Sequence, residues 1–129
     1  MRVVLVGPGH AATGTQGQLL AARLGVPYLT ADVGTDVERA LEGHTAGFVL
    51  DGFPRTPAEA SALDRFLRAR AADLDVALYL PVPDARLTPV EDALLDHYRG
   101  RVVELDAEGD AEVVHERVLD GLREALVAA

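Results

Sequence analysis

Cysteine and lysine are absent from this chain of 129 residues. Without cysteine there can be no disulfide bond and no thiolate metal site, and the composition suits a reducing cytoplasm. All twelve basic residues are arginine, and Ala, Val, Leu, Gly and Asp are abundant, which indicates a biased coding composition. Such a bias explains arginine in place of lysine. It does not explain the loss of a positive charge at a particular position.

The sequence also lacks long apolar runs. No run approaches the ~20 residues that a membrane helix needs. The N-terminal residues do not show a basic segment followed by a long apolar stretch, which is the pattern of an export signal. We therefore expect a cytoplasmic protein without a membrane segment.

Positive charge is scarce, with 12 basic residues against 21 acidic ones and a formal net charge of −9. Because the phosphate backbone of a nucleic acid would be repelled, we expect no non-specific binding to nucleic acid. A small anionic ligand responds to nearby hydrogen-bond donors more than to net charge, so the composition does not exclude one.

Short apolar runs alternate with helical patterns from end to end, and the length fits one domain spanning 1–129. Strands buried on both faces and each followed by a helix predict a three-layer α/β/α fold around a five-stranded parallel sheet. The predicted strands are Arg2–Val6, 28–30, 47–50, 76–80 and 102–105. The predicted helices cover 14–24, 35–41, a segment that starts at 57, 89–98 and a segment that starts at 110.

Three helix starts carry the spacing of a capping box, in which a threonine precedes a glutamate by three residues. The pairs are Thr35 with Glu38, Thr56 with Glu59, and Thr88 with Glu91. For the helix after Thr56 the expected core positions are Ala60, Leu63, Phe66 and Leu67. For the last helix they are Val113, Val114, Val118, Leu122 and Leu126.

Two separated segments resemble one family. MRVVLVGPGHAATGTQGQLLAARLGVPYLTAD is similar to the opening of an adenylate kinase, and GFVLDGFPRTPAEASALD is similar to that family's nucleoside-monophosphate contact loop and the helix after it. The order of the segments and their strand–turn–helix context match as well. The resemblance implies the core of a P-loop nucleoside kinase.

The resemblance covers the core and not the mobile parts of the family. Only one short helix fits between Asp32 and Gly47, where adenylate kinases carry an insert that closes over the monophosphate. VPDARL leads almost directly into DALLDHYRGR, which leaves no room for the lid over the triphosphate. The helix with arginines that flanks the lid is not evident either. The resemblance therefore indicates a truncated and degenerate member.

The first loop departs from the family pattern G-P-P-G-A-G-K-G-T-Q. The resemblance implies that Gly7, Gly14 and Thr15 contact a nucleotide, with the threonine hydroxyl at Mg²⁺. Thr13 stands where the family has its phosphate-binding lysine. Losing that cation removes a contact worth roughly 1.5–3 kcal/mol. The remaining exchanges put Gly9, His10 and Ala12 where the family has Pro, Gly and Gly.

The start of the helix after this loop still favours an anion through its unpaired N–H groups and its dipole. His10 adds part of a positive charge when it is protonated. The alternative is that the loop is a relic that only connects the strand to the helix and does not bind a triphosphate tightly.

The second loop, DGFPRT, keeps the residue types of the family. The resemblance implies that Asp51 helps organise Mg²⁺ and water, that Arg55 grips the monophosphate, and that Gly52 shapes the pocket beside the ribose. Asp32 falls in the segment around the monophosphate. Glu59 stands where the family has a glutamine that reads adenine, and an ionised glutamate cannot donate a hydrogen bond. The structural alternative is that Asp51 pairs with Arg55 or caps the loop.

Three functions remain open. The first is a catalytically impaired relative that binds AMP, ADP or ATP, with Mg²⁺, or another small phosphate ligand. The second is an active small nucleotide phosphotransferase with Arg55 and Asp51 as catalytic residues, in which Arg55 and residues of a partner replace the missing groups. The third is a non-enzymatic homodimeric interaction module. We expect no protein-bound metal centre. We favour the first function, because phosphoryl transfer needs several cations and the exclusion of water, and the sequence lacks the loop lysine, the lid and the arginines beside the lid at once.

Overall fold

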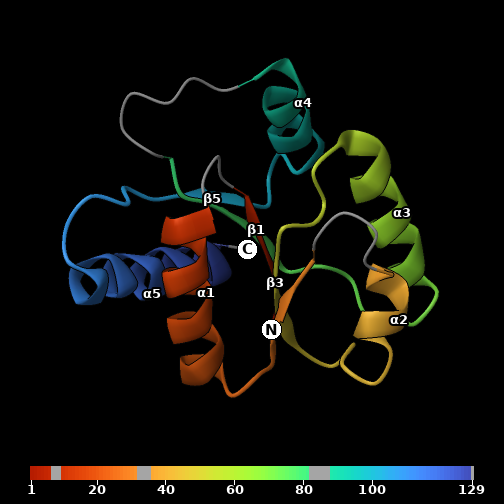
Figure 1. Ribbon diagram of the computed structural model, residues 1–129, viewed down its shortest axis with the longest axis horizontal. Helices are drawn as coiled ribbons and strands as arrows, with labels where there is room; N and C mark the ends of the chain where they lie inside the picture. Colours follow the sequence, from red (N-terminus) through yellow and green to blue (C-terminus); the bar gives the residue numbers. More distant parts are fainter. Residues whose placement is uncertain (7–9, 32–35, 82–87, 129) are drawn as a thin grey trace.

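The computed structural model describes residues 1–6, 10–31, 36–81 and 88–128, and for 10–12 and 126–128 it describes the backbone only. Strands and helices alternate along the chain, as predicted from the apolar runs (Figure 1). The elements are β1 (Arg2–Val6), α1 (His10–Leu24), β2 (Tyr28–Thr30), α2 (Val37–Leu41), β3 (Phe48–Asp51), α3 (Pro57–Arg68), β4 (Val76–Tyr79), α4 (Pro89–His97), β5 (Val102–Glu104) and α5 (Ala111–Ala128).

The five strands form one parallel sheet in the order β2-β3-β1-β4-β5. In the register, Val4 of β1 pairs with Leu50 of β3 and with Ala77 of β4, so β1 is the central strand. The predicted fold class is confirmed. Since all strands are parallel, the carboxyl ends of β1, β3 and β4 lie at the same edge of the sheet, where open α/β proteins bind ligands.

Helices cover both faces of the sheet. Figure 1 shows α1 and α5 on one side and α2, α3 and α4 on the other. The central strand serves both layers, since Val3 and Leu5 pack with α1 and α5 while Val4 and Val6 pack with the opposite layer. In the described part of the chain, no helix combines the length and the apolar character needed to cross a membrane.

The predicted caps at Thr56 and Thr88 are confirmed. Thr56 Oγ1 accepts a hydrogen bond from the backbone N–H of Glu59 at 3.1 Å, and Thr88 Oγ1 accepts one from Glu91 at 3.1 Å. The predicted cap at Thr35 is wrong, because Asp36 accepts the hydrogen bond from the N–H of Arg39 at 3.2 Å. A carboxylate caps as well as a hydroxyl, so the helix begins one position later.

Two further predictions need correction. Helix α1 starts at His10 rather than at 14, and the residues buried in its first described turns, Thr13, Gln16 and Gly17, do not form an apolar stripe from which this start could be predicted. Val113 of α5 is 48% exposed. The buried stripe of that helix runs through Val114, Val118 and Leu122 at a spacing of four, and position 113 lies beside it. The side chain of Leu126 lies outside the described residues.

Gly52 allows a close approach at the edge of the sheet where β3 ends. Its φ is +89°, and an added Cβ would lie 2.4 Å from the carbonyl oxygen of Ala31. Both the backbone conformation and the space therefore require glycine at this position. Gly100 has nearly the same φ, +90°, but nothing lies within 4 Å of an added Cβ.

This pair predicts two different costs for the same substitution. Gly100→Ala should lower the free energy of unfolding by about 1 kcal/mol, since it adds only backbone strain. Gly52→Ala should cost about 1–3 kcal/mol more, because the methyl group also overlaps a carbonyl. Urea unfolding followed by circular dichroism measures both, and equal losses would contradict the close approach at Gly52.

Candidate functional site

A cleft of about 280 Å³ opens where β1 and β3 end and α4 begins. Its walls come from three stretches that lie far apart in the sequence and meet at the carboxyl edge of the sheet. The lining residues are Leu5, Val6, Thr13, Asp51, Gly52, Pro54, Arg55, Thr88, Val90, Glu91 and Leu94. Thr13, Asp51, Gly52 and Arg55 had been predicted from the sequence, and the fold places them in one cavity.

Thr13 lies in the first turns of α1, is 3% exposed and lines the cleft. A hydroxyl therefore stands where the resemblance predicts an ammonium group. Gly14 follows it, and Thr15 is exposed on the other side of the helix, against a different hollow. His10 is the first residue of α1, and its side chain is not described; Gly7 and Asp32 lie outside the described residues.

Asp51 is the last residue of β3 and is 5% exposed. Its Oδ2 accepts a hydrogen bond of 2.7 Å from the hydroxyl of Tyr28 on β2. Burial, followed by the hydrogen bond and the negative charge of Asp51, raises the pKa of Tyr28 above its usual range. In the described part of the chain Asp51 and Arg55 form no ion pair. The structure therefore does not show the predicted alternative in which these two residues pair.

Arg55 stands at the rim of the cleft. Its guanidinium Nη2 donates to the carbonyl of Ala31 at 3.1 Å, and its backbone N–H donates to Glu59 Oε1 at 2.9 Å. The side chain of Glu59 therefore links the DGFPR turn to the first turn of α3. This contact holds Arg55 where a phosphate group in the cleft could reach it.

Glu91 is a cleft residue that the sequence did not indicate as part of a site. Its Oε1 accepts a hydrogen bond from Thr88 Oγ1 at 3.1 Å. Its Oε2 is buried, and no described group donates a hydrogen bond to it. The capping spacing located this glutamate at the start of a helix, but only the order of the strands brings that helix beside Asp51.

The charges around the cleft are unfavourable for a highly charged phosphate. Its described lining contains one cation, Arg55, against the carboxylates of Asp51 and Glu91. The wall formed by α4 contributes Val90, Glu91 and Leu94, an acid and two apolar side chains, rather than an arginine. A larger hollow of about 710 Å³ between α2 and α3 contains none of the predicted site residues.

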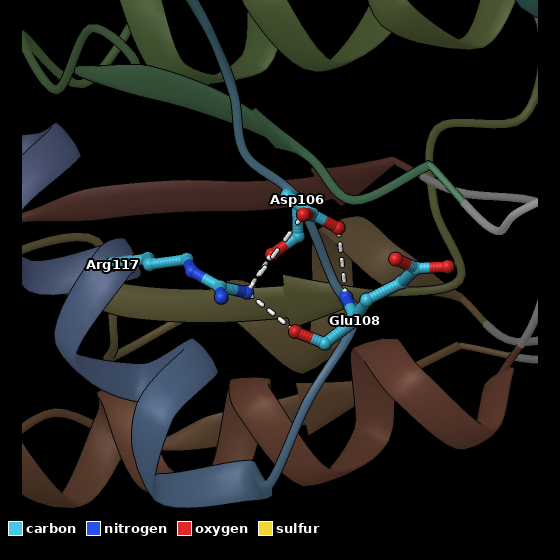
Figure 2. A network of polar contacts seen from close by, with 3 residues as sticks. All are labelled: Asp106, Glu108 and Arg117. Carbon is cyan, nitrogen blue, oxygen red and sulfur yellow. Dashed lines mark hydrogen bonds and ion pairs between the residues drawn. The ribbon is translucent and has the colours of Figure 1, made fainter.

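A second, smaller hollow of about 170 Å³ lies on the other side of the start of α1, against the loop between β5 and α5. Gln16 borders it and donates from Nε2 to the carbonyl of Ala111 at 3.0 Å. Figure 2 shows Arg117 of α5 reaching back to this loop, where Nη1 donates to the carbonyl of Asp106 at 3.1 Å and to that of Glu108. Arg117 is thus engaged with the loop and not with the cleft.

Comparison with known sequences identifies similar proteins over nearly the whole chain. An adenylate kinase of Nocardia farcinica is 33% identical, with 95% of this chain and 99% of the relative covered. One from Mycolicibacterium vanbaalenii is 29% identical with the same coverage. The first alignment extends over 179 positions against a chain of 129 residues, as expected when segments of the relative have no counterpart. No family model matches the chain.

Comparison with solved structures supports the fold. A gluconokinase from Sinorhizobium meliloti 1021 superposes with a TM-score of 0.63 at 15% identity and covers 95% of this chain and 91% of its own. A shikimate kinase from Aquifex aeolicus superposes with a TM-score of 0.55 at 15% identity over the full length of both chains. At this identity the likeness concerns the fold alone.

The contact of Glu59 with the DGFPR turn predicts a stability effect. Glu59→Ala should lower the free energy of unfolding by about 1 kcal/mol, because the N–H of Arg55 loses its acceptor. Glu59→Gln should cost less than about 0.5 kcal/mol, since the amide oxygen can accept the same hydrogen bond. Thermal unfolding followed by circular dichroism checks both variants. If the glutamine variant is as unstable as the alanine variant, charge rather than the hydrogen bond holds the turn.

Proposed function

Because the chain belongs to the adenylate kinase family, we propose that it binds a nucleotide or another small phosphate ligand in the cleft and is impaired in phosphoryl transfer. The observation that carries this proposal is the balance of charge in the described lining, which has one arginine and two carboxylates. Thr13, which also lines the cleft, stands at the position of the family's lysine.

Phosphoryl transfer depends on positive charge placed around the migrating group and on the exclusion of water. The start of α1 supplies partial positive charge, which contributes about 0.3–1 kcal/mol to holding an anion. A charge-assisted contact of a lysine contributes roughly 1.5–3 kcal/mol. The helix end therefore supports binding of a resting phosphate but does not replace the ammonium group in a transfer reaction.

The size of the cleft favours a ligand with few phosphate groups. Its volume of about 280 Å³ is near the lower end of the ~300–1,000 Å³ that is typical of ligand sites. The resemblance assigns the side of the cleft around Asp51, Gly52 and Arg55 to a nucleoside monophosphate. AMP is therefore the first ligand to test, with inorganic phosphate as the simplest alternative.

An active phosphotransferase is the second candidate. It is favoured by the similarity to proteins named adenylate kinase and by the fact that Asp51 and Arg55 line one cavity. This function requires further cations from a partner. The homodimeric interaction module stays a prediction, since within the described residues only Val90 and Val113 are large hydrophobic side chains with high exposure.

Removal of the arginine tests where the ligand binds. Arg55→Ala should weaken AMP binding about tenfold, the loss expected for one charge-assisted hydrogen bond. Arg68→Ala, an exposed arginine at the far end of α3, the helix that follows Arg55, is the matched control and should leave the affinity unchanged. Isothermal titration calorimetry measures both. Failure of the unaltered protein to bind AMP or phosphate would contradict the proposal.

Restoring the lysine tests the electrostatic argument. Thr13→Lys should raise the affinity for ATP about tenfold, because it returns a charge-assisted contact to the phosphates. ADP formation from ATP and AMP should stay at background, since no lid excludes water. Thr13→Met controls for the change in side-chain length. Enzyme-like turnover in the lysine variant would show that one cation suffices, which contradicts the argument.

A further inference from the structure

We propose that Tyr28 is a positioning residue of the cleft, which holds Asp51 in the orientation through which a Mg²⁺-bound nucleotide is recognised. This inference rests on the proposed function and adds a residue that the DGFPR motif does not include. The carboxylate of Asp51 would be oriented before the nucleotide and its Mg²⁺ bind.

The hydroxyl of Tyr28 and the carboxylate of Asp51 are joined across two strands. The hydrogen bond to Oδ2 is 2.7 Å long, and Asp51 is 5% exposed, so water has little access to compete for that oxygen. A carboxylate oxygen has no proton to donate when it is ionised, so the phenol is the donor in this contact. The hydrogen bond therefore fixes which oxygen of Asp51 is left for the cleft.

The ring of Tyr28 is itself held in place by α1. An added Cβ at Gly17 would lie 2.5 Å from Cε1 of the ring, and one at Gly14 would lie 3.8 Å from the hydroxyl oxygen. The helix thus lies directly on the ring through two glycines. Because the ring has no room to turn toward α1, its hydroxyl stays directed at Asp51.

The residues around the cleft fit a magnesium ion that is brought by a nucleotide. The described lining offers oxygen donors from Asp51, Glu91, Thr13 and Thr88, the donor type that Mg²⁺ prefers. In the described residues no group of three or more His, Asp or Glu could hold a metal without further ligands. Mg²⁺ is commonly bound by one or two carboxylates together with substrate phosphates. The buried Oε2 of Glu91 accepts no hydrogen bond from a described residue, so a cation or a donor brought by a ligand would satisfy it.

A carboxylate near a metal is usually oriented by a hydrogen bond from a neighbouring group, and loss of that group lowers metal affinity by about 10–100-fold. Tyr28 occupies this place relative to Asp51. Its effect should therefore be confined to the part of nucleotide binding that depends on Mg²⁺.

The test is calorimetric titration with ADP, with and without saturating Mg²⁺. In the unaltered protein Mg²⁺ should tighten ADP binding. Tyr28→Phe should reduce this gain by roughly tenfold while changing the affinity for Mg²⁺-free ADP less than twofold. Asp51→Asn should reduce the gain similarly, and the double variant should be no worse than Asp51→Asn alone, because both act on one contact.

The matched control is Tyr98→Phe, which removes a buried hydroxyl that has no hydrogen-bond partner among the described residues. It should leave the Mg²⁺ gain unchanged.

Equal weakening of ADP binding with and without Mg²⁺ in Tyr28→Phe would reduce Tyr28 to a packing role and overturn the inference. Binding of ADP by the unaltered protein without any gain from Mg²⁺ would overturn it while the proposed function stands. Absence of all nucleotide binding would overturn both. If the phenylalanine variant does not fold, Asp51→Asn decides, and an unchanged gain in that variant counts against the inference.

Discussion

Helix α1 lies directly on the sheet, and the geometry of the cleft depends on this contact. Gly17 leaves room for the ring of Tyr28, which an added Cβ would approach to 2.5 Å. Tyr28 in turn donates to Asp51, and Asp51 borders the cleft together with Thr13 from the same helix. A packing constraint between helix and sheet therefore fixes the position of a carboxylate in the candidate site.

The electrostatics of the cleft separate holding a phosphate from transferring one. Arg55 and the start of α1 attract an anion, whereas Asp51 and Glu91 oppose it unless a cation accompanies the ligand. A transferring phosphoryl group spreads charge over several oxygens and needs several fixed cations. The α4 wall of the cleft does not supply such cations, because its lining side chains are an acid, Glu91, and the apolar Val90 and Leu94. This balance supports the proposal that the cleft binds a phosphate ligand and is impaired in phosphoryl transfer.

Much of the fold could be predicted from the sequence because it depends on local patterns. The buried strands, the caps at Thr56 and Thr88, and the cavity shared by Asp51 and Arg55 follow from runs, spacing and motif. The position of Glu91 in the cleft and the contact of Tyr28 with Asp51 could not be predicted, since they depend on the strand order and on how closely a helix packs. The cap at Asp36 and the exposure of Val113 were missed because neighbouring positions fit the same pattern equally well.

The most direct measurement is phosphorus NMR of one sample that contains the protein, AMP and Mg-ATP. This spectrum reports binding and chemistry together. The account predicts that the AMP resonance shifts or broadens with added protein while the ADP resonances do not grow above those of a protein-free sample. Growth of the ADP resonances at a rate typical of enzymes would contradict the impairment. An AMP resonance that is unaffected by the protein would contradict the binding.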